Sequence, residues 1–105
     1  MEEYEIVFAP TADEDLQAAL QWLDENAPEK VGEWYAGIKA SIRTLSHLPE
    51  RCPDAPENGL WGEEELRQLL FQDDPSKYRI IFTVGKNRVR ILNIRHGARR
   101  FLHEE

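Results

Sequence analysis

Cysteine is almost absent from this chain of 105 residues. Because Cys52 is the single cysteine, the chain can form neither an internal disulfide nor a zinc site built from several cysteines. A chain without disulfides suits a reducing compartment, and we therefore expect a cytoplasmic protein.

Long apolar runs are missing as well. No stretch approaches the roughly 20 apolar residues that span a bilayer. The opening MEEYEIVFAP also lacks the basic and apolar regions of a secretory signal, so we expect no membrane partner. With 41% hydrophobic and 31% charged residues, the composition is that of a folded chain. Its length fits one domain over residues 1–105.

The common signatures of metal and cofactor enzymes are not found. The sequence contains no HExxH pair, no Walker A loop, no GxGxxG turn and no GxSxG elbow. His47 and His103 are far apart and lack the spacing of metal ligands. We expect neither a metal nor a cofactor, and these motifs identify no catalytic residues.

Positive charge is scarce overall but concentrated in one region. The net charge is -7, yet residues 1–66 carry four Lys and Arg against 16 Asp and Glu, whereas residues 67–100 carry nine against two. Such asymmetry is typical of a surface that binds a polyanion or an acidic peptide. It can equally reflect two halves that neutralise each other in the fold, and both interpretations stay open.

The first quarter of the chain predicts a strand followed by a helix. Residues 4–8 (YEIVF) are aromatic and β-branched, and Pro10 ends them. Thr11 and Glu14 have the spacing of a capping box, and apolar residues then recur at helical intervals to about Asn26. We expect an amphipathic helix of about four turns.

A second helix is expected to start near Pro28 and to end at Pro49. Because the link between the two helices is short, they should pack as an antiparallel hairpin. The apolar stripe of the second helix would comprise Val31, Trp34, Tyr35, Ile38, Ile42, Leu45 and Leu48.

The rest of the chain predicts a loop and three strands. Residues 51–65 are rich in Pro, Gly and acids, and we expect a loop that Trp61 anchors to the body of the domain. Strands are expected over residues 66–71, 78–84 and 89–94, separated by turn residues. The order β-α-α-β-β-β indicates an α+β fold, with the helical hairpin on one face of a three-stranded antiparallel meander.

Arginines along the last strands are the first candidates for function. If the Tyr78, Ile80, Phe82 and Val84 side chains face the helices, Arg79 lies on the opposite face, where nothing else in the chain would cover it. Several arginines on one face form an anion site, although a solvated face that limits aggregation is the alternative. The candidate partner-binding residues are Arg67, Arg79, Arg95, His96, Arg99 and Arg100.

His96 stands where the last strand should end. A histidine there can act as a general acid or base because its pKa normally lies near neutrality, or it can be a hydrogen-bonded structural residue. If the protein were a nuclease, the catalytic candidates would be Arg79, His96 and Arg99.

Over almost its whole length the chain resembles the RelE/ParE toxin superfamily of bacterial type II toxin–antitoxin modules, nearer the ParE or plasmid-stabilisation branch. The blocks that carry the resemblance are YRIIFTV and VRILNIRHGARR, in order and spacing, after a helix of the type AxxDLxxAxxW. The residues that match these and the smaller motifs are Ala12, Asp15, Leu16, Ala19, Trp22, Leu48, Pro49, Arg67 and Leu69.

For RelE-like members, the resemblance implies a ribosome-dependent endoribonuclease that cuts mRNA, with Arg79 and Arg99 in the place of its phosphate-stabilising arginines. The sequence departs from that branch because the active-site lysines have no evident match between Arg67 and Tyr78, and the chain ends FLHEE without a catalytic tyrosine. The overall acidity also fits poorly with docking on ribosomal RNA.

The ParE-like branch is therefore the preferred interpretation. It implies a toxin that is not an enzyme and that inhibits DNA gyrase by binding it. In both branches a cognate antitoxin covers the toxin, by strand addition or by helix-in-groove binding on the basic sheet face and the groove beside the hairpin. The third hypothesis is a binding module that keeps the fold without toxicity.

Overall fold

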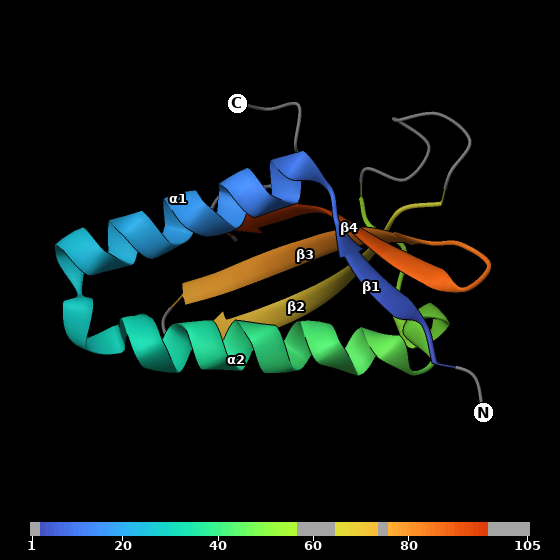
Figure 1. Cartoon of the computed structure of the whole chain (residues 1–105), viewed down its shortest axis with the longest axis horizontal. Helices are drawn as coiled ribbons and strands as arrows, with labels where there is room; N and C mark the ends of the chain where they lie inside the picture. Colours follow the sequence, from blue (N-terminus) through green and yellow to red (C-terminus); the bar gives the residue numbers. More distant parts are fainter. Residues whose placement is uncertain (1–2, 57–64, 74–75, 97–105) are drawn as a thin grey trace.

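A sheet of four strands forms one layer of the molecule, and two helices form the other (Figure 1). The computed structural model describes residues 3–56, 65–73 and 76–96. The strands are β1 (Glu5–Phe8), β2 (Arg67–Asp73), β3 (Ser76–Val84) and β4 (Arg88–His96). The helices are α1 (Pro10–Asn26) and α2 (Val31–Arg43), which run antiparallel as expected from their short connection.

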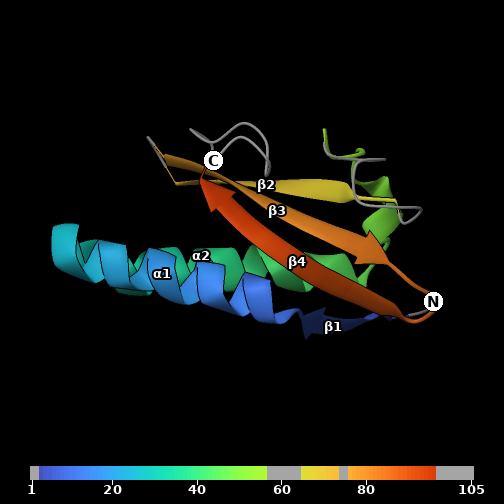
Figure 2. The ribbon, with the colours of Figure 1, turned by 90° about the horizontal axis from the view of Figure 1, so that it is seen from above.

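The sheet has the order β1-β4-β3-β2. Strands β2, β3 and β4 form the predicted antiparallel meander, whereas β1 joins β4 in parallel, from Glu5 opposite Arg88 to Phe8 opposite Ile91. The parallel edge was not anticipated, because the sequence pattern of a strand does not reveal its partner. Figure 2 shows both helices on the same side of the three-stranded meander.

The beginning of α1 donates hydrogen bonds to the edge of β4 beyond the point where β1 ends. Beyond β1, the Ala9 N–H donates to the Ile91 carbonyl at 2.8 Å. The predicted capping role of Thr11 is wrong: the helix begins at Pro10, with Ala9 as its N-cap, and the Thr11 hydroxyl donates to the Leu92 carbonyl at 2.7 Å. Backbone groups of β4 are thus satisfied by a helix where no strand is present.

The second helix is shorter than the pattern predicts. One turn of 3-10 helix, Pro28–Lys30, precedes α2, and two further turns, Thr44–Ser46 and Pro49–Arg51, follow it. Leu48 was expected on the buried stripe, but this is wrong, since it lies outside α2 and is 68% exposed. The chain turns at Leu48 because its φ is 49°, in the left-handed region.

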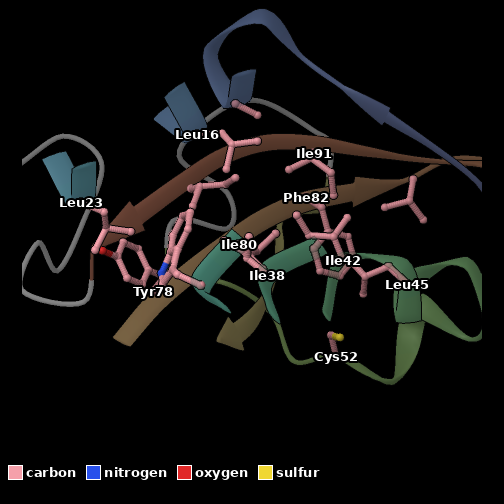
Figure 3. Close-up of a cluster of buried hydrophobic side chains, with 14 residues drawn as sticks. Leu16, Leu23, Ile38, Ile42, Leu45, Cys52, Tyr78, Ile80, Phe82 and Ile91 are labelled. Carbon is pink, nitrogen blue, oxygen red and sulfur yellow. The ribbon is translucent and has the colours of Figure 1, made fainter. Parts of the chain in front are cut away.

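Apolar side chains from both layers meet in one core (Figure 3). Ile38 and Ile42 of α2 pack in the same cluster as Ile80 and Phe82 of β3, and all four are buried. Trp34, which is 1% exposed, meets Tyr78 edge-on with 5.2 Å between ring centroids. This core fixes which face of each strand points away from the helices, and so it positions the candidate site.

Candidate partner-binding site

Leu70, Arg79 and Arg95 lie side by side across the sheet on the face opposite the helices. Leu70 of β2 is the register partner of Arg79 of β3, and Arg79 is the partner of Arg95 of β4. The Arg79 guanidinium donates to the Gln68 Oε1 atom at 3.1 Å. The row places an exposed leucine, 62% accessible, beside two cations.

Arg79 is much less accessible than the sequence suggests. It lies on the predicted face, but the expectation that nothing covers it is wrong, because only 8% of the residue is exposed. Its neighbour on the same face, Ile81, is fully buried in a small cluster with Ala55 and Leu66. The chain around Ala55 crosses back to this face and pairs with Leu66, with 2.7 Å from the Ala55 N to the Leu66 carbonyl oxygen.

Two further cations that sequence reasoning missed share this face. Lys77 is exposed two residues before Arg79, and Arg90 is exposed opposite Thr83. Strict alternation would place Arg90 and Arg95 on opposite faces, but the β3–β4 register shifts between Ile81 and Phe82, which brings them to the same side. Within the described residues of β2, β3 and β4, no acidic side chain alternates onto this face. The alternation of β3 could have identified Lys77, whereas no sequence signal marks the shift.

Arg67 stabilises the fold through contacts within the chain. Its register partner is Phe82, so its side chain lies on the helix side of the sheet and not with Arg79. The guanidinium donates to the Cys52 carbonyl at 2.7 Å and to the Glu50 carbonyl at 3.2 Å, and it pairs with Glu65 at 3.3 Å. These contacts tie the segment before the loop to β2.

His96 also lies on the helix side of the sheet. It is the register partner of Tyr78, and the two rings meet edge-on with 5.1 Å between their centroids. Arg79 points to the other side, so the sheet separates the two described members of the hypothetical nuclease set. Arg99, Arg100 and Trp61 lie outside the described residues.

Cys52, whose carbonyl accepts from Arg67, has a thiol whose pKa is shifted. Burial raises the pKa of its thiol, and the charges of Arg51 and Arg67 offset part of that rise. In the described ranges, no group of three or more His, Cys, Asp or Glu side chains is placed to hold a metal ion. No described helix is long and apolar enough to cross a membrane.

The chain matches a solved structure described as the chromosomal ParDE toxin–antitoxin system from P. aeruginosa, with a TM-score of 0.71 and 19% identity, covering 90% of this chain and 96% of that one. No curated protein matches the sequence. Residues 6–101 match the family model described as the ParE toxin of the type II toxin–antitoxin system parDE. The chain therefore belongs to the ParE toxin family, which confirms the resemblance seen in its sequence.

Proposed function

We propose that this protein inhibits DNA gyrase by binding it, without nuclease chemistry, and that a cognate antitoxin neutralises it. Membership of the ParE family over residues 6–101 supports a target of this kind. The observation that carries the choice against RNA cleavage is the separation of Arg79 and His96 by the sheet, since acid–base and phosphate-binding groups must converge on one reacting group. The proposed toxin domain is residues 1–105.

The cationic face and the outer edge of β2 are the proposed receptor for the antitoxin. Residues before the loop already pair with that edge at its beginning, since the Gln68 N–H donates to the Pro53 carbonyl at 3.0 Å. By alternation, the next residue whose backbone faces outward is Leu70. An extended acidic segment added at this edge would place alternate side chains beside Leu70, on the face that also carries Arg79 and Arg95.

Purified protein and purified gyrase test the target directly. We expect loss of supercoiling and accumulation of cleaved DNA as the protein is added, while mRNA in a translation extract stays intact. Normal supercoiling at saturating protein would refute gyrase as the target, and cleaved mRNA would favour the ribosome-dependent alternative. Induced expression that leaves growth unchanged would favour a binding module without toxicity.

The antitoxin receptor is tested with a pair of charge reversals. Arg90→Glu places a carboxylate on the cationic face, whereas Arg43→Glu makes the same change in charge on the exposed last turn of α2. Calorimetry with the cognate antitoxin should show affinity weakened by about tenfold for Arg90→Glu, through loss of complementary charge. Arg43→Glu should bind as the unmodified protein does. Equal weakening by both would mean that the cationic face is not the receptor.

A further inference from the structure

A pocket lies between α1, the beginning of β3 and the end of β4. Neither the proposed toxin function nor the packing of the core accounts for it. Its volume is about 460 Å³, within the range of about 300–1,000 Å³ that is typical of ligand sites. It opens on the helix side of the sheet, away from the cationic face. Its lining residues are Asp15, Ala18, Ala19, Trp22, Tyr78, Ile94 and His96.

Packing and hydrogen bonds hold the α1 wall of this pocket against the sheet. Leu16 and Leu23 belong to the core cluster, whereas Ala18 and Ala19 between them are too small to fill the adjoining space. The Asp15 Oδ2 atom anchors α1 to the sheet by accepting from the Ile94 N–H at 2.9 Å and from Asn93 Nδ2 at 3.1 Å. A preorganised site of this kind loses less conformational entropy on binding.

The chemistry of the lining suits a flat cation. Trp22 leaves 57% of its surface exposed, which packing within this fold does not explain. A guanidinium stacks on an indole face and pairs with a carboxylate. The Asp15 carboxylate can supply that partner, because its hydrogen bonds to Asn93 and Ile94 both use Oδ2, and a carboxylate has about four acceptor positions. Tyr78 and His96 add aromatic surface on the opposite wall.

The charge around the pocket selects the same class of ligand. The first 29 residues contain no Lys, Arg or His, and α1 carries Asp13, Glu14, Asp24 and Glu25 in addition to Asp15. The resulting negative potential attracts a basic segment and repels the acidic one proposed for the opposite face. The two sides of the molecule thus suit different partner segments.

We propose that this pocket binds an arginine side chain of a basic peptide segment in a partner protein, with the guanidinium between the Trp22 indole and the Asp15 carboxylate. The proposal goes beyond gyrase inhibition and antitoxin binding, and it depends on neither.

Nuclear magnetic resonance of the full-length protein tests this binding, because weak complexes are visible there. The probe is the peptide acetyl-Gly-Arg-Gly-Arg-Gly-amide, and its matched partner carries citrulline, the neutral isostere, in place of each arginine. We expect saturable shifts of the Trp22 indole N–H and the Ile94 amide with the arginine peptide, in the millimolar range. The citrulline peptide should bind about tenfold more weakly or not at all.

Substitutions separate this site from general attraction to acidic surface. Asp15→Asn keeps an oxygen acceptor for the Ile94 N–H while removing the charge, and Trp22→Ala removes the stacking surface; each should weaken binding about tenfold. Glu33→Gln, which removes one charge from the first turn of α2, should leave it unchanged. Equal affinity for the two peptides, equal effects of Asp15→Asn and Glu33→Gln, or no saturable shift would each overturn the proposal.

Discussion

At the scale of single residues, Leu48 has an exposed side chain and a strained, left-handed backbone conformation. Among the described residues other than glycine, it alone has a positive φ, and the residue after it is Pro49. Arg51 holds this turn in place, since its Nη1 atom donates to the His47 carbonyl at 2.8 Å and to the Leu48 carbonyl at 3.1 Å. The left-handed conformation costs a leucine roughly 1–2 kcal/mol, whereas asparagine adopts it more readily.

Leu48→Asn should therefore raise the free energy of unfolding by about 0.5–1 kcal/mol. The matched control is Leu70→Asn, the same substitution at a leucine of similar exposure in β2, where asparagine is unfavourable in a strand. The control should lower the free energy of unfolding. Urea denaturation measures both, and a loss of stability in Leu48→Asn would show that the leucine packs more than its exposure suggests.

The thiol of Cys52 should be unreactive in the folded protein. It is 5% exposed, and burial raises its pKa, so the reactive thiolate is scarce at neutral pH. A disulfide reagent at neutral pH should modify Cys52 only as fast as the protein unfolds, and denaturant should make the reaction immediate. Because the folded-state pKa is raised, the stabilising contribution of the protonated thiol is present below the ordinary thiol pKa and is lost as pH rises through the raised value. Rapid modification of the native protein would contradict this.

At the scale of elements, two glycines of α2 differ in what surrounds them. A Cβ atom on Gly37 would lie 3.0 Å from the Phe71 ring of β2, whereas one on Gly32 would meet nothing within 4 Å. Gly37 therefore allows α2 to approach the sheet closely, and Gly32 costs the helix stability without a packing reason.

Gly32→Ala should stabilise the protein by about 0.5–1 kcal/mol through helix propensity. Gly37→Ala should gain the same propensity but displace Phe71, and overpacking typically costs about 1–3 kcal/mol, so its free energy of unfolding should fall below that of Gly32→Ala by about that amount. Thermal unfolding of the two variants compares them. Equal stabilisation by both would mean that Phe71 moves away at no cost.

At the scale of the whole molecule, β1 forms one edge of the sheet by pairing with β4, although the two strands lie near opposite ends of the sequence. Removal of residues 1–8 would expose the edge of β4 along Arg88–Ile91, and unpaired edges associate. We expect the truncated protein to lose cooperative unfolding and to elute as larger species in size-exclusion chromatography. A control lacking only Glu2 and Glu3 should remain folded, since the exposed Glu3–His47 pair contributes little. A folded monomer without residues 1–8 would contradict the role assigned to β1.

The charges of the molecule are also separated by the fold. Acidic residues of α1 lie on the helix side, and Lys77, Arg79, Arg90 and Arg95 lie on the opposite face of the sheet. Some charges of the two halves neutralise each other, since Arg88 pairs with Glu5 at 3.2 Å. The remaining excess of positive charge forms the face on which we propose that an acidic segment binds.

Local patterns in the sequence determined the elements and their order. The alternation of Tyr78, Ile80 and Phe82 correctly predicted which face of β3 packs against the helices, because a strand has a side-chain period of two. The spacing of Leu16 and Leu23 predicted the buried stripe of α1, because side chains of a helix return to the same face with a period of about 3.6 residues. Family membership followed from the order of these motifs.

Only the tertiary structure decided which candidate residues meet. The register shift beside Ile81 brings Arg90 and Arg95 to one face, Arg67 turns to the carbonyls around Cys52, and the parallel pairing of β1 with β4 places α1 along the sheet edge. These outcomes depend on contacts between residues far apart in the chain. The pocket beside Trp22 exists for the same reason, because Asp15 binds the backbone of β4, a strand that lies 79 residues away at Ile94.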